Sequence, residues 1–399
     1  MKILQVTNKV PYPVKDGGAI ACMNLTRGFS LLGHKVTVLS MNTRKHFVEP
    51  DEIPDSIKDL AGFKLVPVPA HTSYVAALFN LFFSAKPYNA VRFISTDFKN
   101  ELIRILQENE FDVVQLEGLY VCPYIPVIRA NSNALVVYRS HNIEHEIWER
   151  AAEMSKGFTK IYLKNLAKRI RRFQISWLNT YDLLVPITER DGAILDELGN
   201  TKKRLVSQTG IDLSMLVPTS KNLEHPSLFH IGSLEWIPNQ EGLLWFVDKC
   251  WPEIHKKNPD LKFYIAGRNA PKWLVGKFKQ PNIVFLGEIA DAYEFMNSKS
   301  IMVVPLFSGS GMRIKIIEGM ALGKAIVTTP VGTEGISTTP GKDVLVAENK
   351  DDFIAAIEKL LNNKSFFMEI GKNAIEFIHE NFDNLKASAD LLEFYKQHC

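Results

Sequence analysis

The 399-residue sequence contains four cysteines, and no two of them form a C-x-x-C pair. Such isolated thiols are typical of a reducing compartment and argue against a disulfide framework or a zinc–cysteine site. The N-terminus lacks the apolar core of about 7–15 residues that a signal peptide needs. No run reaches the roughly 18 apolar residues of a membrane-spanning helix. We therefore expect a cytoplasmic protein.

Neither sign of charge is in large excess. The sequence has 47 Lys and Arg against 44 Asp and Glu, which gives a formal net charge of +3. A nucleic-acid-binding protein usually has a strongly basic domain or stripe. The composition therefore disfavours a nucleic-acid partner, while 46% hydrophobic residues are enough for sizeable cores.

Short apolar runs alternate with segments of helical period along the whole chain. Runs of this length, rich in Val, Ile and Leu, predict strands that are buried on both faces of parallel sheets. They cover residues 3–7, 35–40, 64–68, 112–116, 135–139, 182–187, 228–231, 261–266, 283–286, 301–304 and 325–328. One sheet of that many strands is improbable. We therefore predict an α/β protein with two doubly wound, Rossmann-like domains that face a cleft.

A proline-containing stretch of low periodicity, residues 216–227, is the predicted hinge. It separates an N-terminal domain, 1–217, from a C-terminal domain, 226–382. The tail, 383–399, reads as a helix that returns to complete the N-terminal domain. Its apolar side is expected to hold Leu385, Leu391, Leu392 and Phe394. Because open parallel sheets bind ligands beyond the carboxyl ends of their strands, the strand-to-helix turns are the places to look for a site.

The turn after residues 301–304 is rich in glycine, with Gly309 and Gly311 on either side of Ser310. A helix is expected to begin at about Met312. Glycines at a helix N-terminus let backbone N–H groups approach an anion, which the helix dipole also favours. This turn is the strongest candidate for phosphate binding.

Charged residues follow in the same predicted helix. Arg313 and Lys315 lie in its first turn, where cations oppose the helix dipole unless an anion lies between them. Glu318 lies further along and could accept two hydrogen bonds from a vicinal diol such as a ribose. Gly323 is expected to end the helix. The alternative is an ordinary glycine turn with a solvated basic face.

Gly17 and Gly18 follow the first predicted strand and open a second helix. The sequence there is not G-x-G-x-x-G, and the next strand ends in Ser40 and Met41 with no acid to hold an adenosine ribose. These features disfavour a nicotinamide-dependent dehydrogenase. The pair is interpreted either as a ligand contact or as a tight turn.

His141 stands just past the end of the predicted strand 135–139. It is a candidate site residue, although a lone histidine is often satisfied locally. Together with Glu144 and His145 it also spells H-x-x-E-H, a zinc motif of metallopeptidases. That motif requires both histidines on one continuous helix. Because His141 follows a strand so closely, the zinc interpretation is the weaker one.

Two segments could contact a surface. Residues 74–83 are more apolar than an ordinary exposed helix, and residues 156–172 hold seven basic residues and no acid. A basic amphipathic helix can lie on an anionic membrane. Each segment could equally be packed on a core.

The order of these turns resembles the glycosyltransferase group 1 family of retaining enzymes, which have two Rossmann-like domains in the GT-B architecture. The resemblance runs from the Gly17-Gly18 turn and GHKVTVLS (33–40) through His141 to TGIDLSMLVP (209–218). It continues with HIGSLEWIPNQEGLLWF (230–246), GSGMRIKIIEGMALGKAIV (309–327) and VGTEGI (331–336). It therefore covers nearly the whole chain.

The resemblance implies roles for these residues. Glu318 matches the carboxylate that binds the donor ribose, His141 lies near the transferred sugar, and Gly17-Gly18 faces the donor phosphates or the acceptor. The sequence departs from the family pattern at Ser310, where a first glutamate is usual. It departs again at Ser233 and Asn239, where Arg and Lys are usual. We expect Arg313 and Lys315 to hold the phosphates instead.

The resemblance also implies the reaction: a hexosyl group moves from a nucleoside diphosphate sugar to an acceptor hydroxyl with retention of configuration. The sequence has no D-x-D pair to hold Mg²⁺, so we expect no metal and no cofactor. The predicted pathway is surface or capsular polysaccharide or glycolipid synthesis, with a saccharide or lipid-linked saccharide acceptor and peripheral contact with an anionic membrane. The alternatives are a catalytically silent nucleotide-sugar-binding protein and the zinc peptidase.

Overall fold

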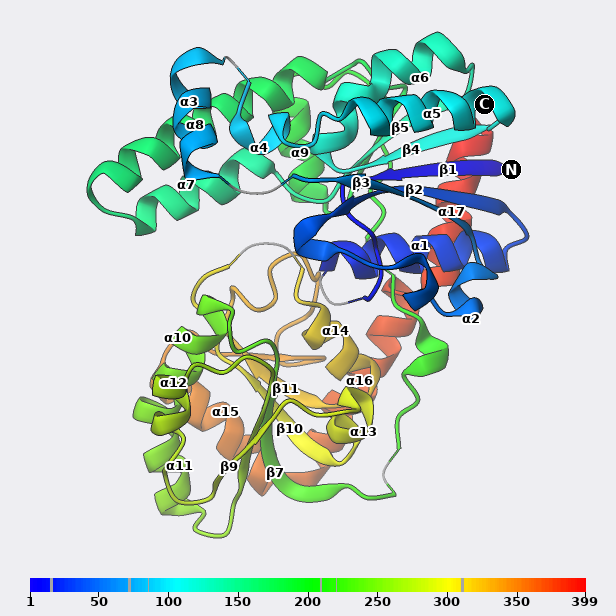
Figure 1. Cartoon of the computed structure of the whole chain (residues 1–399). Coiled ribbons are helices and arrows are strands. Elements are labelled where there is room, and N and C mark those ends of the chain that lie inside the picture. Colours follow the sequence, from blue (N-terminus) through cyan, green and yellow to red (C-terminus); the bar gives the residue numbers. More distant parts are fainter. Residues whose placement is uncertain (15–16, 71–72, 85, 209, 220, 310–311) are drawn as a thin grey trace. The chain divides into compact units, whose positions relative to one another are not determined.

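The computed structural model describes residues 1–14, 17–70, 73–84, 86–208, 210–219, 221–309 and 312–399. Its contacts divide the chain into an N-terminal unit, Met1–Gly210 with Asn384–Cys399, and a C-terminal unit, Ile211–Asp383. Each unit is a parallel six-stranded sheet with helices on both faces (Figure 1), so the predicted fold class is confirmed. None of the helices within the described ranges is long and apolar enough to cross a bilayer.

The sheet of the N-terminal unit has the strand order β3-β2-β1-β4-β5-β6. Its strands are β1 (Lys2–Thr7), β2 (Lys35–Thr43), β3 (Gly62–Val68), β4 (Val113–Glu117), β5 (Leu135–Ser140) and β6 (Leu183–Pro186). The order reverses between β1 and β4, and a crevice forms beyond the carboxyl ends of strands at such a reversal. Thr7, Glu117 and Ser140 are the last residues of β1, β4 and β5, so they mark the place where a ligand is expected.

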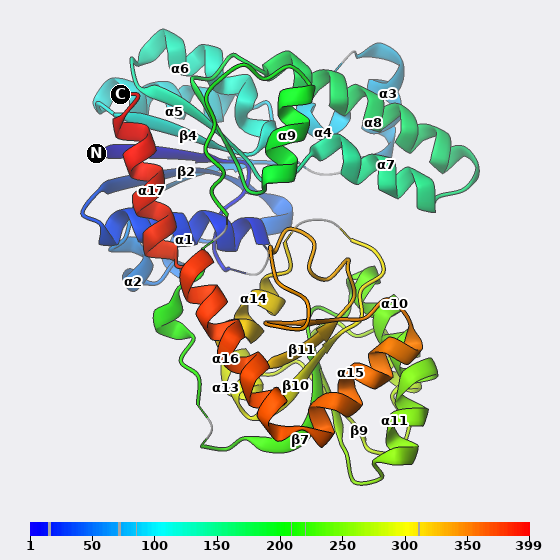
Figure 2. The same cartoon turned by 180° about the vertical axis from the view of Figure 1, so that it is seen from behind.

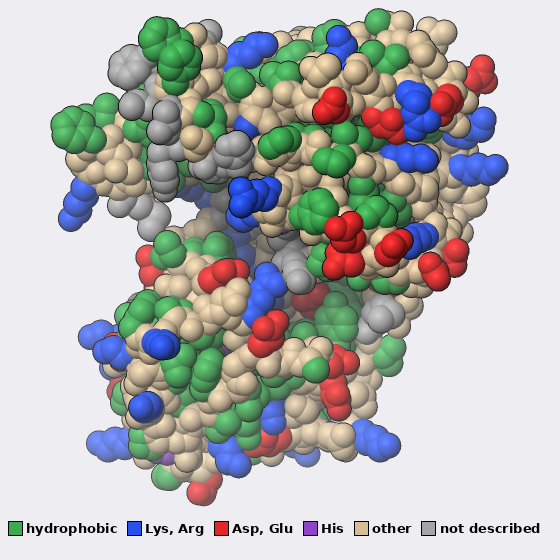
Figure 3. Space-filling model, viewed as in Figure 1, with side chains coloured by type: hydrophobic (Ala, Val, Ile, Leu, Met, Phe, Trp, Pro, Cys, Tyr) green, Lys and Arg blue, Asp and Glu red, His purple; other side chains and the backbone are tan. Residues whose placement is uncertain are grey.

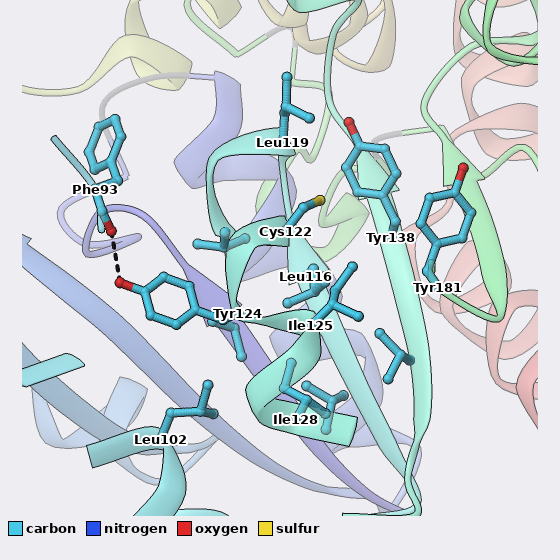
Figure 4. Close-up of a cluster of buried hydrophobic side chains, with 14 of the residues drawn as sticks. Phe93, Leu102, Leu116, Leu119, Cys122, Tyr124, Ile125, Ile128, Tyr138 and Tyr181 are labelled. Atoms are coloured by element: carbon cyan, nitrogen blue, oxygen red, sulfur yellow. Dashed lines mark hydrogen bonds between the residues drawn. The ribbon is translucent and has the colours of Figure 1, made fainter. Parts of the chain in front are cut away.

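Helices cover both faces of this sheet. They are α1 (Gly17–Leu31), α2 (Asp55–Lys58), α3 (Tyr74–Phe83), α4 (Tyr88–Val91), α5 (Thr96–Glu108), α6 (Ile125–Asn131), α7 (Glu144–Met154), α8 (Gly157–Trp177), α9 (Glu189–Glu197) and α17 (Asn384–Lys396). On one face, side chains of α5, α6 and α8 pack with the strands and with aromatic residues such as Tyr124 and Tyr138 (Figure 4). On the other face lie α1 and α17 (Figures 1 and 2).

The C-terminal helix α17 returns to the N-terminal unit, as predicted. Leu391, Leu392 and Tyr395 are buried against Phe29 of α1 and the strands behind it. The placement of Leu385 on this apolar side was wrong, because Leu385 is exposed. The buried face is instead continued by small and polar residues, since Ser388 lies under Gly28 of α1 and the two helices approach closely there.

The C-terminal unit has the strand order β12-β11-β10-β7-β8-β9. Its strands are β7 (Glu224–Ile231), β8 (Phe263–Ala266), β9 (Ile283–Gly287), β10 (Lys299–Val304), β11 (Ala325–Thr328) and β12 (Leu345–Val346). Its helices are α10 (Ile237–Trp245), α11 (Trp251–Lys257), α12 (Lys272–Lys277), α13 (Ala292–Asn297), α14 (Ile314–Ala321), α15 (Lys350–Asn362) and α16 (Lys364–Asn381). The order reverses between β7 and β10, so a second crevice is expected beyond those strands.

The division between the units comes earlier than the predicted hinge. Ile211 is buried in the C-terminal unit, and its backbone N–H donates to the carbonyl of Phe382 at 2.9 Å. The last residues of the predicted hinge are already strand, because β7 begins at Glu224. An ion pair from the Nζ of Lys299 to Glu224 at 2.5 Å fixes that end of the strand.

Candidate functional site

The N-terminal unit has a small hollow beyond the carboxyl ends of β1, β4 and β5. Its volume is about 200 Å³, and it includes Gly18 at the start of α1 and His141 just after β5. Gly17 is the first residue of α1, and a Cβ there would meet no atom within 4 Å. The structure therefore brings Gly18 and His141 together, as expected for residues at neighbouring strand-to-helix turns.

Glu117, the last residue of β4, holds His141 in this hollow. The Nε2 atom of His141 lies 2.6 Å from Oε2 of Glu117, and the Nη1 atom of Arg139 donates to the same oxygen at 3.2 Å. Burial alone would raise the pKa of Glu117, but the charge of Arg139 and the hydrogen bond from His141 lower it to about 2. Glu117 is therefore a buried carboxylate that stays ionised at neutral pH.

This network extends to the C-terminal helix. Gln115 of β4 donates its amide to Oε1 of Glu117, and Tyr395 of α17 donates its hydroxyl to Oε1 of Gln115 at 2.6 Å. None of these partners is predicted from the sequence. The only sequence feature that points to Glu117 as a site residue is its position, an acidic residue at the end of an apolar run. Nothing in the local sequence indicates its contact with His141.

The zinc interpretation is contradicted by the geometry of this turn. His141 precedes α7, so the two histidines do not lie on one continuous helix. His145 is buried and its Nδ1 atom lies 3.0 Å from Oε1 of Gln174, whereas Glu144 accepts a hydrogen bond from the hydroxyl of Tyr120 at 2.8 Å. Nowhere in the described ranges do three or more His, Cys, Asp or Glu side chains form a group that could hold a metal ion.

In the C-terminal unit, the glycine turn follows β10 and leads into α14. Gly309 has φ +116°, and a Cβ there would come within 2.9 Å of the Trp236 ring, so only glycine fits. Ser310 and Gly311 lie outside the described residues. The helix begins at Ile314, two residues after the predicted start at Met312. Gly323, at φ +67°, follows its end as predicted.

Arg313 is the N-cap residue of α14 and is almost completely buried. Its guanidinium lies 5.8 Å from the centre of the Trp236 ring, and Nη2 lies 3.9 Å from Oε2 of Glu334. Arg313 is therefore a pre-positioned cation at a helix N-terminus. Glu334, which is partly exposed, is a competitor for any anion that binds there.

Lys315 reaches the end of β7. Its Nζ atom donates to Oδ1 of Asn239 at 2.6 Å. Burial and the charge of Arg313 lower the pKa of Lys315 to about 7. A Cβ at Gly232 would lie 3.2 Å from this Nζ atom and 2.9 Å from Nδ2 of Asn239, so the absence of a side chain at Gly232 keeps this region open.

His230, the second-last residue of β7, borders the same space. Its Nδ1 atom donates to the carbonyl of Val303 at 2.8 Å, which leaves Nε2 as the acceptor nitrogen. Nε2 is buried and has no hydrogen-bond partner among the described residues, and it lies 3.6 Å from the Cβ position of Gly232. Burial and the charge of Lys315 hold the pKa of His230 well below its usual value, so the ring is neutral. His230 is not among the site residues predicted from the sequence.

Glu318 lies one turn further along α14 and is mostly buried. The hydroxyl of Tyr293 donates to its Oε1 atom at 3.0 Å. Burial raises the pKa of Glu318 to about 7, and the hydrogen bond from Tyr293 limits that rise. The predicted residues Arg313, Lys315 and Glu318 therefore lie at the N-cap and along the first two turns of α14, and Lys315 lies beside the end of β7.

Residues 225–363 match the family model described as "Glycosyl transferases group 1". An uncharacterized 44.6 kDa protein in the cps region of Klebsiella pneumoniae is 23% identical, covering 98% of this chain and 99% of that protein. Sucrose-phosphate synthase from Thermosynechococcus elongatus is similar in structure, with a TM-score of 0.72 and 14% identity. The match covers 100% of this chain and 99% of that one. HepE from Anabaena, solved with UDP and glucose, has a TM-score of 0.68, 13% identity and complete coverage of both chains.

The regions matched in these comparisons include both sheets and the turn that leads into α14. The family model covers most of the C-terminal unit, including the end of β7 and the whole of α14. The solved structures cover both units. Residues 225–363 are therefore similar to the glycosyltransferase group 1 family, and the chain has the GT-B fold.

Proposed function

We propose that the protein transfers a sugar from a nucleoside diphosphate sugar to an acceptor hydroxyl, with retention of configuration. The observation that carries the proposal is the cluster of Lys315, Arg313 and Glu318 on α14, inside the region matched by the family model. HepE, which shares the fold, was solved with UDP-glucose. The remaining support is the resemblance of the motifs described above.

The two cations of α14 are the proposed diphosphate site. Lys315 has a lowered pKa because its ammonium is buried next to another cation, and a bound diphosphate would supply the missing negative charge. The N-terminus of α14 adds backbone N–H donors and a favourable dipole. Groups fixed in place before the reaction stabilise the charge that develops on the leaving diphosphate without reorganisation.

Glu318 is the proposed ribose ligand. Tyr293 occupies its Oε1 atom, so Oε2 is the oxygen assigned to a ribose hydroxyl. Only the ionised carboxylate accepts hydrogen bonds through both oxygens, and its raised pKa places half-ionisation at about pH 7. Donor binding is therefore expected to be sensitive to pH in the neutral range.

His141 is the proposed residue beside the transferred sugar, and Glu117 is its positioning residue. The hydrogen bond of Nε2 to Glu117 fixes the ring and directs Nδ1 away from that carboxylate. For a retaining transfer, we propose that the leaving phosphate helps to deprotonate the acceptor. An inverting transfer would instead use the pair of His141 and Glu117 as a general base.

The anomeric configuration of the product distinguishes a retaining from an inverting transfer. Incubation with the donor and a competent acceptor, followed by NMR of the anomeric proton, is expected to show the anomeric configuration of the donor. The inverted anomer would refute retention while leaving sugar transfer intact. Activity is expected to persist in excess chelator, because we propose that neither a metal nor another cofactor takes part. Failure to release nucleotide from any sugar donor would favour the catalytically silent alternative.

The proposed pathway is surface or capsular polysaccharide or glycolipid synthesis, with a saccharide or lipid-linked saccharide acceptor. It rests on the relative from the cps region of Klebsiella pneumoniae, which matches almost the full length of both chains. Loss of surface polysaccharide from cells that lack this protein, restored by the wild-type chain, is the direct test. Unchanged polysaccharide in such cells would contradict the pathway.

Peripheral contact with an anionic membrane is the last part of the proposal. Phe158 and Ile161 of α8 are 91% and 67% exposed, and Figure 3 shows hydrophobic side chains projecting from the end of the unit that holds α3 and α8. Cations continue the same exposed face of α8 at helical spacing; they are Lys164, Lys168, Arg171 and Arg172. Apolar side chains followed by cations suit a bilayer with anionic headgroups.

Co-sedimentation with vesicles tests this contact. We expect binding to vesicles that contain phosphatidylglycerol and much less binding to pure phosphatidylcholine. The Phe158→Ser/Ile161→Ser variant should lose it, whereas Leu385→Ser, which also changes an exposed apolar residue of the same unit, should not. Equal binding by both variants would refute this surface.

A further inference from the structure

The N-terminal unit has a second and larger cavity, with a volume of about 750 Å³. It lies beyond the carboxyl ends of β1 and β2, where Asn8 and Thr43 line it. Its other walls come from the short 3₁₀ helix that follows β2, Arg44–His46, from α4 with the residues after it, and from Trp148 of α7. Neither the sequence motifs nor the proposed donor site uses this cavity.

The charged residues that are described as lining this cavity are all basic. Lys9, Arg44, Lys45 and Arg92 line the cavity together with His46, and no Asp or Glu is among the described residues that line it. Three of these basic residues are consecutive in the sequence, and all three are exposed. Because cations that line one concave surface focus a positive potential there, the cavity attracts anions.

The remaining walls suit a saccharide. Trp148 and Phe93 supply aromatic surface, and the side chains of Asn8 and Asn89 supply both donors and acceptors. The guanidinium of Arg92 lies 4.8 Å from the centre of the Phe93 ring. Sites for small polar ligands typically combine apolar walls with a few placed polar groups. Inorganic phosphate alone would leave most of a cavity of this volume unfilled.

The cavity adjoins the hollow of His141. Asn8 and Lys9 line both spaces. Phe93, on the cavity side, stacks at 5.5 Å on Tyr120, which lines the hollow. A molecule in the larger cavity can therefore present a hydroxyl to the side where His141 lies. All of these residues belong to the N-terminal unit.

We propose that this cavity binds the acceptor, and that the acceptor is a saccharide that carries an anionic group, a phosphate or a carboxylate, held by Arg44, Lys45 and Arg92. The inference rests on the proposed glycosyl transfer and specifies its acceptor class. It places the anion at the basic wall and the reacting hydroxyl toward His141.

Binding of simple probes to the full chain tests the inference. Ligand-observed NMR titrations would compare glucose 1-phosphate and glucuronic acid with the neutral methyl glucoside, at low and high salt. We expect both charged probes to bind more tightly than the neutral one, with affinity that falls as salt rises. The Arg44→Gln/Lys45→Gln variant should weaken the charged probes by about 10-fold or more, since each charge-assisted contact is worth at least that factor.

The matched control is Lys99→Gln, which neutralises an exposed lysine of α5 away from this cavity. Lys99→Gln should leave the binding of all three probes unchanged. Three outcomes would overturn the inference. They are equal affinity for charged and neutral probes, no binding of either charged probe at millimolar concentration, and a loss of binding in Lys99→Gln equal to that in Arg44→Gln/Lys45→Gln. Binding of only the phosphate or only the carboxylate probe would support it and identify the anion. Release of nucleotide from a sugar donor by the wild-type chain tests the proposed function separately, so the two failures are distinguishable.

Discussion

Replacing Glu117 by glutamine tests the buried charge network beneath His141. The side chain of Glu117 is 3% exposed and that of Arg139 is fully buried. Glutamine keeps the shape of the residue but removes the charge that balances Arg139. Removing one partner of a buried ion pair typically costs about 3–5 kcal/mol, because the remaining charge is left uncompensated. We therefore expect Glu117→Gln to destabilise the N-terminal unit by that amount.

The measurement must report on this unit, because a chain with two units need not unfold in one step. Hydrogen exchange of peptides that cover β4 and β5, followed with rising temperature, is suitable. For a unit of this size, 1 kcal/mol shifts the unfolding midpoint by about 2–4 °C, so a decrease of roughly 6–20 °C is expected. The double variant Glu117→Gln/Arg139→Met should recover most of the loss, since it also removes the buried charge that the single variant leaves uncompensated.

The surface supplies a matched control. Glu101 pairs with Arg104 at 2.6 Å on α5, but the arginine of this pair is about half exposed. Glu101→Gln should therefore shift the midpoint much less than Glu117→Gln. The reasoning would be refuted if Glu117→Gln unfolded like the wild type, or if the double variant were as unstable as the single one.

Three further predictions concern the proposed site. The Lys315 ammonium has a pKa of about 7, so it is charged below that pH and neutral above it. Calorimetry should therefore show that the affinity for a nucleoside diphosphate, divided by the affinity for the nucleoside, falls by up to about tenfold per pH unit above pH 7. A ratio that does not change with pH would exclude Lys315 from the phosphate site. Glu318→Ala should weaken the nucleoside by about 10- to 150-fold, and unchanged affinity in a folded variant would contradict the ribose assignment. His141→Ala should lower kcat by about 100-fold and leave the nucleotide affinity unchanged. His145→Ala should mainly lower stability, because His145 is buried against Gln174. Equal losses of kcat in the two variants would contradict this difference.

Most of the fold was predictable because most of its strands are buried on both faces, although β3 and β9 are partly exposed. Every apolar run named in the sequence analysis forms a strand, and β4, for example, is buried at all five of its residues. β12 escaped detection because two residues, Leu345–Val346, carry no pattern. The early end of the N-terminal unit was missed because a backbone hydrogen bond between residues 211 and 382 leaves no local sequence signal.

The candidate site was predictable where its chemistry is local. Lys315 and Glu318 are three residues apart on one helix, so helical spacing places them on the same face, and Arg313 directly precedes that helix. The partners that tune these residues come from elsewhere in the chain: Tyr293 for Glu318, and Asn239 for Lys315. Such contacts depend on the strand order of the sheet, which composition and periodicity do not specify.

The departures from the family pattern at residues 233 and 239 are connected to Lys315 by the fold. The resemblance places cations at Ser233 and Asn239, just after β7, and the chain has none there. The structure brings the ammonium of Lys315 to the Oδ1 atom of Asn239 in α10, so a cation from α14 lies beside a position where the family pattern has a cation. Gly232 keeps that space open, and a lysine at 239 would add a second buried ammonium beside the first. Because two like charges in a buried site disfavour each other, a lysine at 239 would add to the effect of Arg313 and lower the pKa of Lys315 further.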